Sequence, residues 1–328
     1  MLNDELRGWI EQQLRGELSE LPGMNALTAT FQLSLQRLQS LRMTDQMQEE
    51  PTTGSLLGAF ASFAPVCAAA FEEYLSCFWQ HFPKHGTGTP TEVSTGADFA
   101  IIINQEVGKS RLAVFQAKRP TSSDPDKFKI HHLRKRPASK SVDGEAQIPQ
   151  FLRLLYHAIS IAQKEERNES HVITLESIHW VHYLIYGQKL RCLSLDKLAS
   201  VKSCYDKQMP DQPWPTPKPV SIEESESRYL FWLLTNGATP SCSGDELKGW
   251  LEIDRSKVDE IRESLTAFTN VYIGHHGPGP KHTNNPEGAP ISPTKILEQV
   301  HRTHDVPKRY TDLLTTSPSN QPTPRPKM

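Results

Sequence analysis

The sequence predicts an α/β fold in which helices surround a sheet, with helical additions at the N-terminal and C-terminal ends of the chain. Three observations predict it. Apolar residues recur at helical spacing over the first quarter of the chain, and two apolar strands joined by a short polar turn follow. An amphipathic helix and an aromatic-rich strand come next. At 328 residues the chain is long enough to bury a sizeable core.

Three helices are expected in the N-terminal part. The first covers residues 2–21, where leucines recur at intervals of three and four, and Pro22-Gly23 ends it. The second runs from about residue 27 to 43. The third begins near Glu49 and Thr52 and continues to about residue 82, with a bend at Pro65.

The pattern then changes to the period of strands. Residues 91–120 read TEVSTGADFAIIINQEVGKSRLAVFQAKRP, which predicts a hairpin whose turn holds Gly108. An amphipathic helix is expected over 145–166. The next strand is expected over 179–187, because its aromatic and β-branched residues favour a sheet.

The composition divides the chain into five parts. From Met209 onward, proline replaces periodic apolar residues, which indicates a linker. Two helices, about 222–235 and 244–270, are expected beyond it, and the last residues have the composition of disordered tails. The parts are an N-terminal helical segment (1–45), a core domain (46–208), a Pro-rich linker (209–221), a small helical region (222–275) and a Pro-rich tail (276–328).

Bulk composition excludes several classes of protein. The net charge of −2 does not indicate a nucleic-acid binder, so local charge must decide that question. The five cysteines include no CxxC pair, which argues against a disulfide framework or a zinc ribbon and favours a reducing compartment. The acidic N-terminus is no signal peptide, and we see no apolar run of membrane-spanning length. We expect a cytoplasmic protein without membrane contact.

Three polar residues interrupt the predicted hairpin. Asp98 opens the first strand, and Gln116 and Lys118 lie on one face at the end of the second. The start of the first strand of a hairpin lies beside the end of the second. Counting residues back from the turn therefore predicts that a carboxylate, an amide oxygen and an ammonium group lie close together across the two strands.

This trio suits metal-assisted hydrolysis of a phosphodiester. Mg²⁺, or Mn²⁺ in its place, prefers oxygen ligands, which Asp98, Gln116 and the carbonyl of Ala117 offer. Lys118 cannot ligate beside a cation, but its ammonium group can polarise a phosphate oxygen or help to activate a water.

The segments GADFAIII and LAVFQAKR resemble the D-x(n)-(D/E/Q)-x-K motif of the PD-(D/E)xK nuclease superfamily. The Gln variant is similar to Mrr-type restriction endonucleases and related bacterial defence nucleases. The order helix, hairpin, helix, strand over residues 48–187 agrees with this resemblance. It implies a restriction-endonuclease-like core, in which helices flank a mixed central sheet.

The resemblance also implies further site residues. An additional acid often comes from the preceding helix, where Glu50 is the best match and Glu49 the next, with Glu92 as a rival nearer the hairpin. Glu50 would then join the metal ligands. A Gln often opens the helix after the motif, where Gln147 and Gln150 stand; both are also ordinary surface or helix-start residues.

The function implied by the resemblance is a Mg²⁺-dependent endodeoxyribonuclease, with a role in bacterial antiphage defence. The residues themselves do not distinguish DNA from RNA. The alternative is an inactive nuclease-fold protein that binds nucleic acid or serves as an adaptor subunit. Either protein could form a homo-oligomer or associate with a defence-system partner.

A basic segment follows the motif. From Lys118 to Lys140, both included, eight Lys and Arg residues stand against two Asp residues, which suits contacts to phosphates. A solvated loop is the plain alternative. The candidate nucleic-acid-binding residues are Arg119, Lys127, Lys129, Arg134, Lys135 and Arg136.

Each site residue also has a purely structural interpretation. Asp98 could cap a strand, and Gln116 with Lys118 could be a surface pair on an edge strand, where Lys opposes aggregation. Glu50 could be an acid favoured by the dipole at a helix start. These interpretations stand or fall together, because a catalytic Asp98 would need the other two residues.

Overall fold

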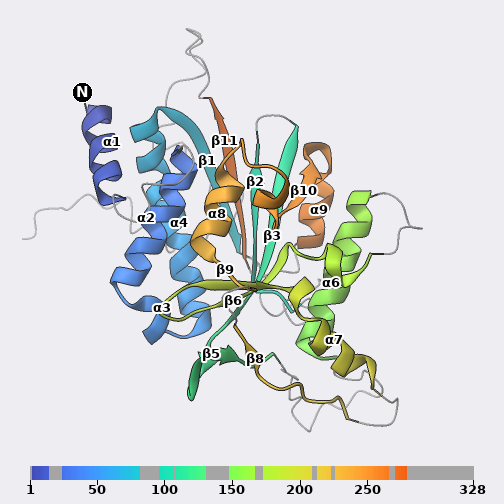
Figure 1. Cartoon of the computed structure of the whole chain (residues 1–328). Helices are drawn as coiled ribbons and strands as arrows, with labels where there is room; N and C mark the ends of the chain where they lie inside the picture. The colour runs from blue at the N-terminus through green and yellow to red at the C-terminus, as the bar shows by residue number, and fades with distance from the viewer. Residues whose placement is uncertain are drawn as a thin grey trace, which may run out of the picture. The chain divides into compact units, whose positions relative to one another are not determined.

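A computed structural model gives the fold of the chain (Figure 1). It describes residues 2–14, 24–81, 96–105, 108–130, 148–166, 173–208, 213–222, 226–265 and 270–278. All of these belong to one unit, residues 1–279. Within them, helices flank a mixed sheet, so the predicted α/β class and mixed sheet are confirmed.

The helices lie along the whole described chain. The α-helices are α1 (Leu2–Gln13), α2 (Ala26–Ser40), α3 (Met43–Gln46), α4 (Glu49–Phe71), α6 (Gln150–Glu166), α7 (Ala199–Asp206), α8 (Leu230–Ala238) and α9 (Val258–Leu265). The 3-10 turns are η1 (Leu175–Ser177), η2 (Leu195–Lys197), η3 (Gly244–Leu247) and η4 (Arg255–Lys257).

The strands form a large and a small sheet. In the described chain, the large sheet has the order β1-β11-β2-β3-β6-β7-β9, and β10 also pairs with β3. The small sheet has the order β4-β5-β8. The bounds are β1 (Glu73–His81), β2 (Phe99–Asn104), β3 (Lys109–Lys118), β4 (Pro120–Thr121), β5 (Asp124–Phe128), β6 (Val181–Ile185), β7 (Arg191–Ser194), β8 (Val220–Ser221), β9 (Arg228–Tyr229), β10 (Leu251–Asp254) and β11 (Asn270–Pro278).

Helices cover both faces of the large sheet, with α2, α4 and α8 on one face and α6, α7 and α9 on the other. Strands β2 and β6 are therefore buried along their entire length. Successive side chains of β3 point alternately into the hydrophobic cores on the two faces of the sheet. Val114 packs on the α6 side and Phe115 on the α4 side.

The predicted hairpin is confirmed. Strands β2 and β3 pair antiparallel, with Phe99 opposite Phe115 and Asn104 opposite Ser110. Strand β6 then pairs parallel with β3, so that Gln116 lies beside Tyr183 and Lys118 beside Ile185. The expected amphipathic helix is α6, and the expected aromatic strand is β6.

The prediction that the third helix continues to about residue 82 is wrong. Helix α4 contains Pro65 and ends at Phe71, and Glu72 adopts a left-handed conformation (φ 52°) that stops the helix. Residues 73–81 form β1, which pairs antiparallel with β11. The aromatic residues of this stretch suit a strand, but its partner strand comes much later in the chain.

The description of residues 222–275 as a helical region is also wrong. The helix expected over 244–270 is instead η3, β10, η4 and α9, and β11 begins at Asn270. Strand β10 pairs with β3, and β11 lies between β1 and β2. This part of the chain therefore completes the same sheet that carries the hairpin.

Other predicted segments lie partly outside the described residues. The first helix is described as far as Gln13, and the tail only for residues 276–278, which end β11. Part of the expected linker pairs with a strand and packs against the core. Its residues Val220 and Ser221 form β8 on β5, and Trp214 packs against the core near Tyr205.

Among the described helices, α4 has the length and apolar composition of a membrane span, although the sequence had suggested none. A core helix passes the same test. Leu56, Leu57 and Phe60 of α4 are fully buried against α2 and the sheet, and 39% of its apolar stretch is buried in all.

Candidate functional site

The hairpin register brings Asp98 and Gln116 together. Continuing the pairing of Phe99 with Phe115 by one residue places Asp98 opposite Gln116, and the Asp98 amide donates to the Phe115 carbonyl at 2.9 Å. Asp98 Oδ2 accepts hydrogen bonds from the Ala117 amide (2.7 Å) and from Gln116 Nε2 (2.5 Å). Counting residues back from the turn thus predicts correctly that Asp98 lies opposite Gln116.

Gln116 is a buried link between two other polar side chains. Only 2% of it is exposed. Its Nε2 donates to Asp98 and to the Ala117 carbonyl (3.0 Å), and its Oε1 accepts from Gln150 Nε2 at 2.8 Å. Such burial contradicts the interpretation of Gln116 as a surface residue on an edge strand, since β3 is paired on both sides.

Gln150 is a member of this network that the sequence suggested only as one of two alternatives. It is the first residue of α6 and is buried. Its Oε1 is also buried and has no hydrogen-bond partner among the described residues. The other candidate, Gln147, lies outside the described residues.

Gly96 explains how α6 approaches the hairpin so closely. It has a φ of +75°, and a Cβ there would lie 2.7 Å from the Gln150 carbonyl oxygen. A side chain would therefore push the first turn of α6 away from Asp98. Glycine is required here both by the backbone conformation and by the available space.

Lys118 follows Gln116 on the same face of β3 and is half-buried. Its backbone carbonyl accepts from the Tyr186 amide at 2.8 Å, which fixes the end of the strand. Within the described residues, no hydrogen bond or ion pair of its ammonium group is found.

The two candidate acids of α4 have different surroundings. Glu49 Oε1 accepts from the Arg119 amide at 2.9 Å, so its half-buried carboxylate touches the end of the motif strand. Glu50 is exposed in the same helical turn. Glu92, the third candidate, lies outside the described residues. The carboxylate of Glu49 therefore contacts the backbone at the end of the motif strand.

The pKa of the Tyr186 phenol is affected by burial and by the carboxylates of both Asp98 and Glu49. Burial raises the pKa of its phenol well above the ordinary value, and the negative charges of Asp98 and Glu49 raise it further. Its hydroxyl lies 2.8 Å from the Thr53 hydroxyl on α4. The neutral phenol thus links β6 to α4 near both acids.

Tyr183 is a buried side chain that the sequence had assigned only to a strand. It faces α6 beside Gln116, and its hydroxyl has no hydrogen-bond partner among the described residues. Burial, mainly, and the nearby Asp98 raise the pKa of this phenol. No sequence signal separates this tyrosine from an ordinary core residue.

The basic residues that follow the motif are only partly described. Arg119 is half-buried and its Nη2 donates to the Asp45 carbonyl, so this side chain holds α3 against the strand. Lys127 is exposed but forms an ion pair with Asp124 (2.8 Å), which raises its pKa through that hydrogen bond. Lys129 is exposed. The remaining candidates, Arg134, Lys135 and Arg136, lie outside the described residues.

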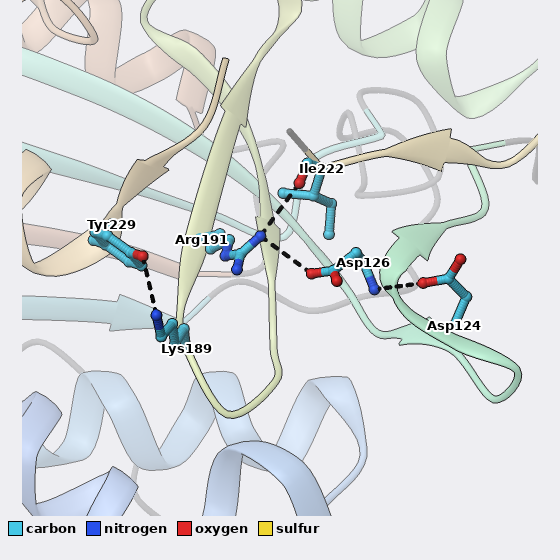
Figure 2. A network of polar contacts seen from close by, with 6 residues as sticks. All are labelled: Asp124, Asp126, Lys189, Arg191, Ile222 and Tyr229. Atoms are coloured by element: carbon cyan, nitrogen blue, oxygen red, sulfur yellow. Dashed lines mark hydrogen bonds and ion pairs between the residues drawn. The ribbon is translucent and has the colours of Figure 1, made fainter. Parts of the chain in front are cut away.

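The small sheet is tied to the large one by Arg191 on β7 (Figure 2). Its Nη1 lies 3.2 Å from Asp126 Oδ1 and 3.2 Å from the Ile222 carbonyl oxygen. Asp124 Oδ1 accepts from the Asp126 amide at 2.9 Å, which shapes the turn into β5. The hairpin that carries Lys127 and Lys129 is therefore held at a fixed place beyond the end of β3.

The site contains oxygen atoms of the kind that a hard divalent cation prefers, but the amide nitrogen of Gln116 faces Asp98 and the Ala117 carbonyl in this structure. In the described chain, no cluster of three or more His, Cys, Asp or Glu side chains is present. Mg²⁺ also accepts amide and carbonyl oxygens. Asp98 and the Ala117 carbonyl offer oxygens directly. Gln116 would add its oxygen if its amide and that of Gln150 were both turned over, which exchanges donor and acceptor in their mutual hydrogen bond.

Comparison of the chain with protein-family models, with curated proteins and with solved structures found no match. The assignment of function therefore rests on the geometry and on the resemblance of the motif.

Proposed function

We propose that this chain is a divalent-metal-dependent nuclease of the PD-(D/E)xK type, with a restriction-endonuclease-like core. The observation that carries the proposal is the contact of Asp98 with Gln116 at 2.5 Å, two residues before Lys118. The resemblance makes DNA the expected substrate. A cytoplasmic role in antiphage defence, alone or with a partner protein, follows from the same resemblance.

Each residue of the proposed site has a distinct task. With the Gln116 amide turned so that its oxygen faces Asp98, these two side chains and the Ala117 carbonyl would hold Mg²⁺ or Mn²⁺. The metal would neutralise phosphate charge and lower the pKa of a ligated water. Lys118 places its ammonium group beside the scissile phosphate and stabilises developing negative charge. Gln150 positions Gln116 through their amide–amide hydrogen bond.

The acid from α4 is assigned to Glu49 rather than to Glu50. Glu49 reaches the backbone of the motif strand, whereas Glu50 is exposed. We therefore expect Glu49→Gln to lower cleavage more than Glu50→Gln. Equal cleavage activities of the two variants would contradict the choice of Glu49 as the acid from α4. They would not affect the assignment of Asp98 as a metal ligand.

The small sheet is proposed to contact the nucleic-acid backbone. Lys127 is exposed on β5 and Lys129 is exposed immediately after this strand, in the part of the chain that follows the motif strand. The ion pair with Asp124 offsets part of the charge of Lys127. We accordingly expect Lys129 to contribute more to the salt dependence of binding.

The proposal is tested by incubating the purified chain with supercoiled plasmid, linear DNA and RNA, with Mg²⁺ or with EDTA. Mg²⁺-dependent cleavage is expected, and Asp98→Ala is expected to abolish it. Glu176→Ala is the matched control, because this carboxylate is exposed in the η1 turn. Cleavage that persists in Asp98→Ala would contradict the proposal.

One observation favours a second function, that of an inactive nucleic-acid-binding or adaptor subunit. The side chains of Asp98, Gln116 and Gln150 are already linked to one another by two hydrogen bonds, as in a purely structural network. A melting curve separates the two functions. A bound metal stabilises the native state by mass action, so Mg²⁺ raises the Tm of the nuclease but not that of the inactive protein.

A further inference from the structure

A small polar pocket opens on the face of the large sheet opposite the Asp98 site. His182 of β6 lies beside Phe115 in the sheet, and the two rings stack with centroids 5.4 Å apart. Gln116 projects to the other face, because side chains alternate along a strand. The pocket, lined by His182, His179, Gly249 and their neighbours, is thus separate from the proposed nuclease site.

One of the residues that line the pocket has an unused hydrogen-bond acceptor. His182 is 2% exposed, and its Nε2 lies 2.8 Å from the Gly249 carbonyl oxygen. A carbonyl only accepts, so Nε2 carries the proton and Nδ1 presents a lone pair. Nδ1 is buried and has no partner among the described residues. Burial, above all, lowers the pKa of His182 to about 4, which keeps the ring neutral near pH 7.

His179 also lines the pocket, and its Nε2–H group is a hydrogen-bond donor. His179 Nδ1 accepts the Gly249 amide hydrogen at 3.1 Å, so the proton of the neutral ring is on Nε2. Burial, mainly, lowers the pKa of His179 as well. Gly249 has a φ of +110°. Its backbone therefore lies between two neutral imidazoles: His182 donates a hydrogen bond to its carbonyl, and His179 accepts one from its amide.

The rim of the pocket is mainly cationic. Lys197, Arg228 and Lys248 line it, against the single carboxylate of Glu226, and the hydroxyls of Ser194 and Ser227 complete the polar lining. Lys197 lies 3.9 Å from Asp196. Arg228 is oriented by the carbonyl oxygens of Lys248 and Asp245, the latter at 3.5 Å. In the described part of the chain, no acidic partner of Lys248 is found.

The size of the pocket limits its ligand. Its volume is about 150 Å³, close to that of cavities that hold one benzene-sized molecule, so it encloses only part of a larger ligand and leaves the rest at the cationic rim. We propose that it binds a hydroxylated phosphate monoester, whose phosphate group lies among Lys197, Arg228 and Lys248 and whose hydroxyl group donates to His182 Nδ1. Charged N–H groups are the usual partners of phosphate, and the buried acceptor selects for the hydroxyl.

Isothermal titration calorimetry of the full chain with ribose 5-phosphate, inorganic phosphate and ribose tests this proposal. Ribose 5-phosphate is expected to bind saturably and more tightly than inorganic phosphate, and ribose alone is expected not to bind. The double variant Lys197→Met/Lys248→Met is expected to weaken binding by at least about tenfold. Lys202→Met is the control, since Lys202 pairs with Asp206 on α7 and does not line the pocket.

Histidine ¹⁵N NMR locates the ligand independently of the lysines. Ribose 5-phosphate is expected to shift the resonance of His182 Nδ1. The proposal is overturned if no phosphate compound binds saturably, if the double variant binds as tightly as Lys202→Met, or if the Nδ1 resonance does not move. Nuclease activity enters none of these measurements, so their outcome is separate from that of the cleavage assay.

Discussion

Arg111 directs its buried guanidinium group at the C-terminal end of α8. Its Nη1 donates to the carbonyl oxygens of Gly237 (2.9 Å) and Thr239 (2.8 Å), and its Nη2 donates to that of Cys242 (2.9 Å). The last carbonyls of a helix lack partners within the helix and carry partial negative charge. One β3 side chain thereby fastens α8 to the central sheet.

We expect Arg111→Met to lower the free energy of unfolding by about 3 kcal/mol, because several buried carbonyls lose a charged donor. Urea unfolding at neutral pH measures this loss. Arg191→Met is the comparison, since Arg191 makes fewer bonds and its partner Asp126 is exposed. A loss for Arg111→Met no larger than that for Arg191→Met would contradict the proposed role.

His182 makes the stability of the fold depend on pH. Its pKa is lowered to about 4 in the folded chain, whereas an unfolded His has a pKa of about 6.5. The unfolded state therefore binds more protons between these values, and stability is lost as the pH falls through this window. We expect a loss of about 2 kcal/mol from this group between pH 7 and pH 5.

Urea unfolding of the parent chain and of His182→Gln at the two pH values isolates this contribution. Glutamine keeps an N–H donor for the Gly249 carbonyl but does not titrate. The variant is expected to lose less stability on acidification than the parent chain. The same loss in both proteins would show that His182 is not the titrating group.

At the scale of elements, the approach of α6 to the hairpin depends on Gly96. Both Gly96 and Gly108 have positive φ values, +75° and +58°, but only Gly96 is crowded. A Cβ at Gly108 would meet nothing within 4 Å. The two glycines thus form a matched pair that separates backbone strain from steric exclusion.

Gly108→Ala is expected to cost about 1 kcal/mol, the ordinary penalty of a left-handed residue with a side chain. Gly96→Ala is expected to cost more and also to reduce Mg²⁺-dependent cleavage, because Gln150 is displaced from Gln116. Thermal melting and plasmid cleavage of both variants measure the two effects. Equal Tm values and equal activities would contradict the role of this contact.

The elements that the sequence predicted well are those set by local interactions. The turn fixes the register of the β2–β3 hairpin, so the pairing of Asp98 with Gln116 follows from counting residues. The burial of Gln150 was not predictable, because it depends on how α6 packs over the sheet. Its signal, a Gln at the start of the helix after the motif, is shared by ordinary helix-start residues.

At the scale of the whole molecule, the sheet is built from distant parts of the chain. Strand β11 inserts between β1 and β2, and β10 pairs with β3 (Figure 1). Local patterns do not encode such pairings. The sequence pattern therefore predicts the end of a helix over residues 73–81 and a separate helix over residues 244–270, where the structure has the strands β1 and β10. The final fold joins both stretches to the sheet that positions the candidate site.

The pocket around His182 arises in the same way. Its lining comes from β6, β7, η2, β9 and the loop after η3, which meet only in the folded sheet. In the sequence, His182 is one of several aromatic residues in a strand pattern. A motif search therefore finds the hairpin site but not this pocket.

The most direct test of the central claim is plasmid cleavage by Lys118→Met in Mg²⁺, beside Lys202→Met as the control. Methionine keeps an unbranched apolar chain as far as the ε-carbon, with sulfur in place of the δ-carbon, and lacks the ammonium group. Cleavage by Lys118→Met is expected to fall at least about a hundredfold, as on removal of other groups that stabilise a transition state, with Tm and metal binding unchanged. Cleavage by Lys118→Met at the rate of Lys202→Met would contradict the assignment of this site as a nuclease centre.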